Sequence, residues 1–364
     1  FYYETYPYWT AKWNARRLPF AYAGKSWELL RDKASYRNAE LDDMPYETNL
    51  PGFGRVFPHP YGPADGKLFT TLLTTSPAGD ELTVSFAKAL IEGEKLGQDD
   101  VPDYLSVSLS STDYVGHLFG PSSLESEDQI LRLDRQIADL LSFVDERIGI
   151  DKTLIVLSAD HGAADPPGYL ERYGIPATYI NPKEWDTTPG LSRLKERFGI
   201  GKELIKSYFH PYIYLDEEAI AKSGASQAEV EREVANEVMK LPGVALAVSS
   251  TALATGAYAD MPLMRSILKN FSPSRSGDVF VVFAPHSFIN DFDGLTVAAH
   301  HGSPWNYDTY VPMIFAGNGL DGRRVARRVE TVDLAPTLAA LLGTKPPSGS
   351  VGKPLTEVID AMDD

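Results

Sequence analysis

The most constraining feature of this sequence is an apolar run from Thr153 to Ala159 that stops abruptly at Asp160, His161 and Gly162. A strand that is apolar on successive residues is typical of a parallel sheet covered on both faces. Ligands of such sheets lie beyond the carboxyl ends of the strands, which is where Asp160 and His161 fall. Gly162 permits a sharp turn or the close approach of another backbone segment. The run therefore predicts a buried strand with a candidate site at its end.

The segments around this run predict an α/β fold. Leu105–Leu109 alternates apolar and small polar residues, as a strand does, and 130–148 has apolar residues at helical spacing. A strand, a helix and a second strand in this order predict parallel neighbours joined by a right-handed crossover. Further strands are expected at 177–180, 213–215, 244–248, 279–283 and 311–316, and further helices at 228–240 and 333–342.

Charge and composition exclude several classes of function. The net charge of −16 disfavours a nucleic acid polymer as partner, because such proteins need clustered Lys and Arg. The absence of cysteine excludes disulfides, thiolate metal sites and cysteine nucleophiles. No apolar stretch approaches the ~20 residues that span a bilayer, so no membrane partner is expected. A small phosphorylated substrate is compatible with the charge if bound metal reverses the local field.

Two glycine-rich motifs suggest nucleotide binding, and we reject both. Gly24-Lys25-Ser26 resembles the end of a phosphate-binding loop, but the glycine required five residues earlier is Pro19. Residues 317–322 match the dinucleotide fingerprint in spacing, yet no helix pattern follows them. A glycine turn between strands explains the second motif better.

Histidines and aspartates recur at the ends of the predicted strands, as Asp113/His117, Asp160/His161 and His300/His301. Asp113 and His117 are four residues apart and would share a face if their loop forms a helical turn. Imidazole and carboxylate ligands without thiolate suit zinc and permit other first-row metals. Five or six such ligands suit a pair of ions ~3.5–4 Å apart. The alternative is that each histidine separately binds a backbone carbonyl.

Around these residues four motifs match a known family in order and spacing. The sequence resembles the alkaline phosphatase superfamily, and within it the bacterial alkaline phosphatases of the PafA type, relatives of the nucleotide pyrophosphatase/phosphodiesterases. The resemblance implies a three-layer αβα sandwich around a mostly parallel sheet, here a single domain over 1–364 with probable insertions at 165–210 and 250–277. The motifs are Ser111-Thr112-Asp113-Tyr114-Val115-Gly116-His117, Ser158-Ala159-Asp160-His161-Gly162, the segment 301–312 that begins His301-Gly302-Ser303, and Thr331-Val332-Asp333 with Pro336-Thr337.

The resemblance also implies a site and a reaction. Asp113, His117 and His301 would bind one zinc, and Asp160 and His161 a second, which gives two Zn²⁺ per active site. His300 would pack or hydrogen-bond nearby instead of binding metal. The implied activity is the hydrolysis of phosphate monoesters in small phosphorylated substrates through a phospho-Thr or phospho-Ser intermediate. The family also implies a periplasmic or secreted location.

The family places its nucleophile and a further zinc-binding Asp near its own N-terminus, and residues 1–100 contain no equivalent. We therefore expect a missing N-terminal portion, about a third of a domain of well over 500 residues. No catalytic nucleophile is then expected in this chain, and its own N-terminal fragment is a candidate partner. The opening from Phe1 to Trp9 and the later aromatics of 1–60 are expected at the surface, in irregular structure.

Three other functions stay open. A phosphodiesterase or nucleotide pyrophosphatase could use the same metal ligands, because ligands do not set the ester class. A sulfatase is less favoured, since its modified nucleophile derives from Cys or Ser and this chain has no Cys. The third alternative is a metal-binding module without turnover.

Overall fold

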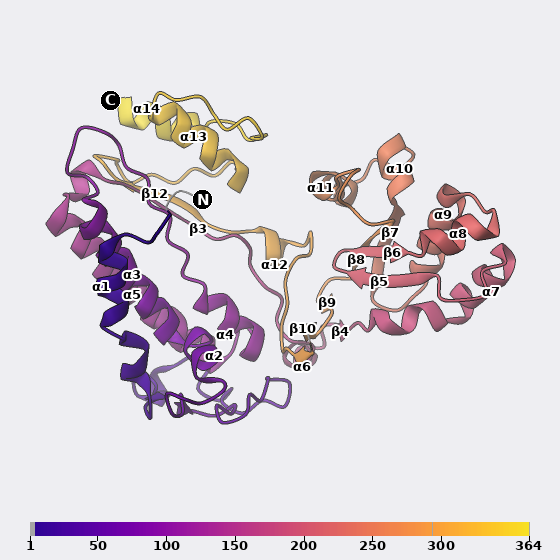
Figure 1. The fold of residues 1–364 in the computed structure, drawn as a ribbon, viewed down its shortest axis with the longest axis horizontal. Coiled ribbons are helices and arrows are strands. Elements are labelled where there is room, and N and C mark those ends of the chain that lie inside the picture. The colour runs from indigo at the N-terminus through magenta and orange to yellow at the C-terminus, as the bar shows by residue number, and fades with distance from the viewer. Residues whose placement is uncertain (1–3, 293, 364) are drawn as a thin grey trace.

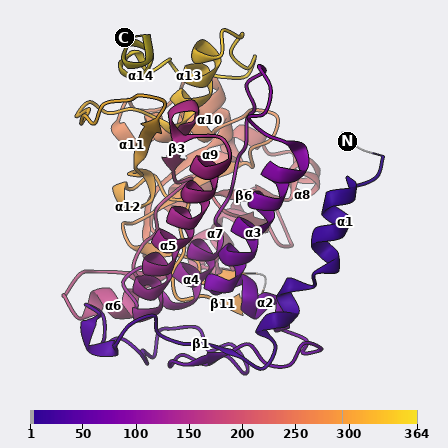
Figure 2. The ribbon, with the colours of Figure 1, turned by 90° about the vertical axis from the view of Figure 1, so that its left-hand side faces the viewer.

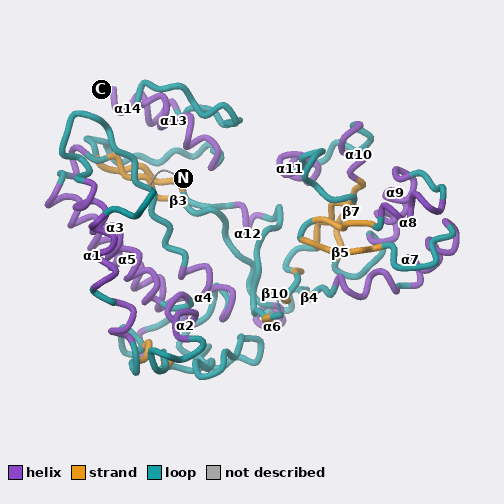
Figure 3. The backbone as a smooth tube through the Cα atoms, in the orientation of Figure 1, coloured by secondary structure: helices purple, strands orange, loops and turns teal. Residues whose placement is uncertain are grey.

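The computed structural model describes residues 4–292 and 294–363, so the aromatic residues Phe1–Tyr3 lie outside the described part of the chain. The chain forms two lobes joined by loops (Figures 1 and 3). One lobe is built from both ends of the sequence and the other from its middle. Within the described ranges, no helix combines the length and the apolar character that crossing a bilayer requires.

The first lobe packs helices beside a two-stranded sheet. Strand β3 (Leu154–Ser158) pairs antiparallel with β12 (Met313–Gly317), with Val156 opposite Phe315. Helices α1, α3 and α5 lie side by side along this lobe (Figure 2). Its helices and short strands are α1 (Tyr8–Ala15), β1 (Ser26–Trp27), β2 (His59–Pro60), α2 (Phe69–Thr74), α3 (Pro77–Glu94), α4 (Ser111–Phe119), α5 (Leu124–Arg147), α13 (Leu334–Leu341) and α14 (Thr356–Asp363).

The second lobe is an antiparallel four-stranded sheet in the order β5-β6-β8-β7, with helices around it (Figure 1). Strand β8 is buried at every residue, which explains its unbroken apolar sequence. The elements are η4 (Pro182–Thr187), α7 (Pro189–Phe198), β5 (Ile205–Phe209), β6 (Tyr212–Leu215), α8 (Glu217–Ser223), α9 (Gln227–Val238), β7 (Val244–Ser249), α10 (Ser250–Thr255), α11 (Pro262–Asn270) and β8 (Val279–Phe283).

Short elements and loops lie between the lobes, and they bring the candidate site residues together. Strands β4 and β9 form a parallel pair, and β10 and β11 form a hairpin. The bounds are α6 (Pro167–Glu171), β4 (Thr178–Tyr179), β9 (Ser287–Phe288), β10 (Asp291–Phe292), β11 (Leu295–Thr296) and α12 (Asn306–Thr309). Single 3₁₀ turns complete the chain at Leu18–Tyr22, Lys33–Ser35, Ile150–Lys152 and Thr331–Asp333.

The sheet differs from its prediction in two details. The strand at 154–158 exists, but it is only partly buried, with Leu157 42% exposed, because β12 is its only partner among the described strands. That partner is antiparallel, and β4–β9 is the one parallel pair described, so the mostly parallel sheet that was expected is not present among the described strands. The segment Leu105–Leu109 lies outside every described strand pair, so the predicted crossover to a parallel neighbour is also wrong here.

The aromatic residues of 1–60 are not all at the surface, contrary to expectation. Trp27, Tyr36 and Phe53 are 2%, 5% and 2% exposed, and Trp27 and Phe53 belong to the core under α4. The indole N–H of Trp27 donates to the buried carboxylate of Asp128 at 2.6 Å. Loop-rich sequence thus folds into a buried layer because its polar groups find partners on α5.

This layer also buries ionisable groups. His59 and Glu125 are fully buried, and the imidazole Nε2 lies 3.3 Å from Glu125 Oε1. Glu47 is 5% exposed, and one of its carboxylate oxygens accepts the Met44 N–H at 2.9 Å. Burial, and then the nearby charge of Glu125, raise the pKa of Glu47 to about 9. The folded state therefore keeps Glu47 protonated at pH values where an unfolded chain loses that proton.

We expect Glu47→Gln to stabilise the protein at alkaline pH. Stability falls as pH rises from the ordinary value of 4.5 to about 9, because ionisation of Glu47 favours the unfolded chain over this range. Glutamine cannot ionise, so the variant's melting temperature relative to wild type should rise by at least ~2 °C between ~pH 5 and ~pH 9. The exposed Glu203 provides a control, since Glu203→Gln should give a difference that does not vary with pH. If the difference in melting temperature between Glu47→Gln and wild type did not vary with pH, Glu47 would not be a buried, neutral acid.

Candidate metal centre

Helix α4 positions the first two candidate ligands. Its first residue is Ser111, whose backbone N–H donates to the buried carboxylate of Asp80 on α3 at 3.1 Å. One turn of this helix separates Asp113 from His117, and His117 Nε2 lies 3.4 Å from Asp113 Oδ2. The predicted helical turn at this motif is therefore confirmed, and it places both side chains on one face.

Two loops bring further imidazoles to the same carboxylate. His301 Nε2 lies 3.5 Å from Asp113 Oδ1, and His161, which follows β3, lies 3.9 Å from the same oxygen through its own Nε2. The His161 and His301 rings stack with their centroids 3.4 Å apart and their planes 11° apart. Asp113 thus lies at the centre of three imidazoles from three separate parts of the sequence.

The hydrogen bonds behind the imidazoles orient them for metal binding. His117 Nδ1 lies 2.8 Å from the Ala299 carbonyl, and His161 Nδ1 lies 2.9 Å from the Gly162 carbonyl. A carbonyl can only accept, so each Nδ1 carries a proton, and Nε2 is the nitrogen left to interact with Asp113. When it is deprotonated, an Nε2 that faces a carboxylate oxygen can share a divalent cation with it. The alternative, a histidine that only binds a carbonyl, accounts for Nδ1 but not for the direction of Nε2.

The charges of the cluster influence one another. Burial would raise the pKa of Asp113, but the hydrogen bond from His117 and the charges of His117, His301 and His161 outweigh it, and its pKa is lowered. Burial, and then repulsion from His161, lower the pKa of His301 to about 4. Asp113 is therefore ionised and His301 neutral near neutral pH, whereas at His117 the effect of burial is outweighed by Asp113, which raises the pKa of that imidazole.

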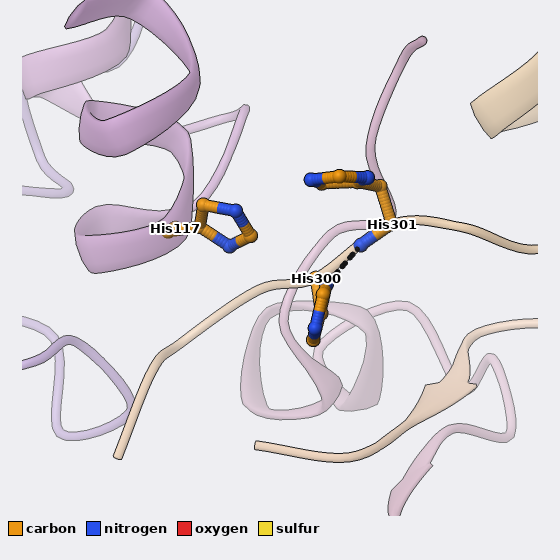
Figure 4. A group of neighbouring side chains, drawn as sticks. All are labelled: His117, His300 and His301. Atoms are coloured by element: carbon orange, nitrogen blue, oxygen red, sulfur yellow. Dashed lines mark hydrogen bonds between the residues drawn. The ribbon is translucent and has the colours of Figure 1, made fainter. Parts of the chain in front are cut away.

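His300 lies beside the cluster but is oriented differently (Figure 4). His117 extends from α4 toward the loop of His301, while His300 Nδ1 accepts the backbone N–H of His301 at 2.8 Å. One of its nitrogens lies within 4.8 Å of ligand atoms of His117 and His301. Because Nδ1 accepts, the proton of the neutral ring is on Nε2, and neither nitrogen has a free lone pair. The expectation that His300 hydrogen-bonds nearby is confirmed.

Asp160 lies at the rim of the cluster. Its Oδ2 is 3.4 Å from His161 Nε2, and its Oδ1 accepts the His161 backbone N–H at 3.1 Å. Its side chain is 87% exposed, and among the described residues the three-membered ligand groups near Asp113 do not include it. The structure thus brings Asp113, His117, His161 and His301 together, with Asp160 adjacent. Their assignment to two separate zinc ions stays a prediction.

The segment after His301 holds residues that the sequence analysis did not single out. Gly162 approaches it so closely that a Cβ on this glycine would lie 2.1 Å from the Tyr307 carbonyl oxygen, which confirms the expected close approach. The Asp308 carbonyl accepts the Gly162 N–H at 2.7 Å. The sequence could have indicated Asp308, because it lies inside the segment 301–312, one of the motifs that resemble the family.

The fold is α/β, and one helix and two loops bring three imidazoles around one carboxylate, an arrangement that could hold a metal ion. The chain belongs to the type I phosphodiesterase/nucleotide pyrophosphatase family, whose model matches residues 7–304. The expected α/β fold of the alkaline phosphatase type is confirmed by a crystal structure of the alkaline phosphatase PafA, which superposes with a TM-score of 0.87 at 31% identity over 98% of this chain and 67% of that one.

Curated relatives agree with this assignment. Alkaline phosphatase PafA of Elizabethkingia meningoseptica is 32% identical over 99% of this chain and 65% of its own length. Alkaline phosphatase PhoV of Synechococcus elongatus is 33% identical over 98% of this chain and 63% of its own length. The chain thus spans just under two thirds of the length of these two relatives.

Proposed function

We propose that the protein to which this chain belongs hydrolyses phosphate monoesters in a metal-dependent reaction. The observation that carries the proposal is the Asp113 carboxylate, which has three imidazole nitrogens within 3.9 Å. Two relatives that share about a third of its residues over nearly the whole chain are named alkaline phosphatases. Substrates would be small phosphorylated molecules, and the location would be periplasmic or extracellular.

The proposed roles divide five side chains between two ions. Asp113, His117 and His301 would hold one divalent ion, and Asp160 and His161 the second; zinc suits this set of imidazoles and carboxylates. When bound, such a pair supplies positive charge for the attacking and leaving oxygens of a displacement at phosphorus. The chain itself contributes fixed positions: α4 presents two ligands on one face, and backbone carbonyls hold the imidazole Nε2 atoms toward Asp113.

The nucleophile in this proposal is a Thr or Ser outside residues 1–364, which would form a phospho-enzyme intermediate. In residues 4–292 and 294–363, no Ser or Thr hydroxyl hydrogen-bonds to any of the five proposed ligand side chains. Leu105–Leu109 lies outside every described strand pair and leads into α4, while β3 has an open edge and leads to Asp160. A further strand paired beside them would also end at the metal centre. An N-terminal fragment of the same protein is the proposed source.

A second candidate function is phosphodiester or pyrophosphate hydrolysis at the same centre. The description of the matching family favours it, because it names phosphodiesterases and nucleotide pyrophosphatases. The metal ligands serve both reactions, so the groups that contact the second ester substituent would decide between them.

The test compares the natural protein, as isolated and weighed by intact mass, with the 364-residue chain alone. We expect the natural protein to hydrolyse p-nitrophenyl phosphate faster than bis(p-nitrophenyl) phosphate, to lose activity with a chelator, and to regain it with zinc. The 364-residue chain should bind zinc without turnover. A preference for the diester would support the second candidate. Activity that survives the chelator would contradict a metal-dependent reaction. Turnover by the 364-residue chain alone would contradict a nucleophile that lies outside it.

A further inference from the structure

Both loops that carry candidate ligands are fastened to the same residue of α12. The Gly162 N–H donates to the Asp308 carbonyl at 2.7 Å, directly after His161. The Ser303 N–H donates to Asp308 Oδ2 at 2.7 Å, two residues after His301. Asp308 therefore holds one loop through its main chain and the other through its carboxylate.

The Asp308 carboxylate is buried at a cost to stability. The residue is 3% exposed, and its second carboxylate oxygen, Oδ1, has no hydrogen-bond partner among the described residues. A buried carboxylate with an unpartnered oxygen destabilises the fold relative to a neutral side chain of similar size. Stability alone therefore does not explain an aspartate at position 308. A role in holding the His301 loop does explain it, because a carboxylate is a strong hydrogen-bond acceptor with a fixed orientation toward that loop.

Two side chains beside Asp308 anchor the segment that carries it. The Trp305 indole N–H donates to the carbonyl of Phe283 at the end of β8, at 3.0 Å. The Tyr307 hydroxyl accepts the His286 N–H at 2.9 Å, and the two rings stack with centroids 4.7 Å apart. These contacts connect α12 to the second lobe, so Asp308 rests on a fixed support and can determine where both loops lie.

We infer that Asp308 is a positioning residue that sets the spacing between His161 and His301, and thereby couples the two halves of the metal centre. The two rings lie 3.4 Å apart and approach the same oxygen of Asp113, so a shift of either loop would separate them. The part of the inference that is measured by metal binding rests on the proposed function. The spacing of the two rings does not, because it is a property of the chain without metal.

The first measurement is zinc affinity and stoichiometry of Asp308→Asn and Asp308→Ala, by competition with a chromophoric chelator. Asparagine keeps an oxygen that can accept the Ser303 N–H, whereas alanine removes it. We expect the alanine variant to lose ~10- to 100-fold in zinc affinity, as loss of a supporting residue does, and the asparagine variant to lose less. The inference would be overturned if Asp308→Ala kept wild-type zinc affinity and its histidine signals did not move. Should Asp308→Ala fail to fold, the same two results in Asp308→Asn would overturn it.

A matched control separates positioning from general stability. Asp186 is 7% exposed, and its carboxylate accepts the N–H groups of Leu204 and Ile205 at 2.9 and 2.8 Å, far along the second lobe. Asp186→Asn should lower the melting temperature and leave zinc affinity unchanged. Equal losses of zinc affinity in both variants would mean that Asp308 acts only through stability.

The second measurement uses the chain without metal, so that it does not depend on the proposed function. Histidine side-chain NMR signals report the stacked rings of His161 and His301, because each ring shifts the resonances of the other. We expect Asp308→Ala to move these two signals and to leave that of His59, which is buried elsewhere, in place. If wild type binds no zinc but the two signals move, the proposed function fails and the positioning role stands; unmoved signals contradict the positioning role.

Discussion

Asp113→Ala should abolish high-affinity zinc binding by the chain and nearly all hydrolysis by the natural protein. The substitution removes the one carboxylate that lies between His117, His161 and His301. Three imidazoles without a counter-charge would bind a divalent ion far more weakly. The loss in affinity and in kcat/KM should exceed the roughly 100-fold that loss of an outer-shell partner costs. Equilibrium zinc binding and steady-state kinetics measure the two effects.

Folding should survive this substitution, because the Asp113 side chain makes no hydrogen bond to a backbone group among the described residues and is not a helix cap. Circular dichroism and thermal unfolding check that point. Asp134→Ala, at an exposed aspartate of α5, is the control and should leave both zinc affinity and kcat/KM unchanged. Near-normal turnover in Asp113→Ala would show that Asp113 is not part of the metal centre.

Gly162→Ala is expected to displace the loop that carries Asp160 and His161. The added methyl group would lie 2.1 Å from the Tyr307 carbonyl oxygen and 3.2 Å from its carbon. These are backbone atoms of the anchored α12 segment, so the glycine loop must move instead. A displacement on the order of 1 Å at a catalytic site can lower a rate about 100-fold. We expect at least that loss in kcat/KM, together with weaker binding of the second zinc equivalent.

Gly116→Ala provides the matched control. Gly116 lies on α4 between Asp113 and His117, and a Cβ there would meet no atom within 4 Å. Alanine should therefore be tolerated and should stabilise the helix by up to ~1 kcal/mol, with unchanged zinc affinity. If Gly162→Ala behaved like Gly116→Ala in zinc binding and turnover, the close approach at Tyr307 would have no role in shaping the centre.

The sequence predicted the residues of the candidate site better than the strand pairing and packing around them. The four-residue spacing of Asp113 and His117 predicted one helix face, and α4 provides it. The glycine after His161 predicted a close backbone approach, which occurs at Tyr307. These features are local, so a few neighbouring residues determine them. The fold class was also predictable, because the motifs that carry the resemblance extend over most of the chain.

The partners of each segment were less predictable, because they depend on residues far apart in the sequence. An apolar run such as 154–158 indicates a strand but not the direction of its neighbour, which is the antiparallel β12. The burial of Trp27 depends on Asp128, about a hundred residues away. The role of Asp308 likewise depends on Gly162 and Ser303, which approach it from two different loops. No spacing rule links such positions.

The segment Leu105–Leu109, which pairs with no described strand, also affects how the chain should be handled in solution. Its backbone amides and carbonyls form no hydrogen bond with another described residue, and its apolar residues are only half covered. Unpaired strand backbone is a template for pairing between molecules, and long flat edges of this kind promote aggregation. A lysine replacing Val107 would place a charge on that edge and discourage self-association. Isolated preparations of the chain should accordingly remain dispersed longer with Val107→Lys than without it.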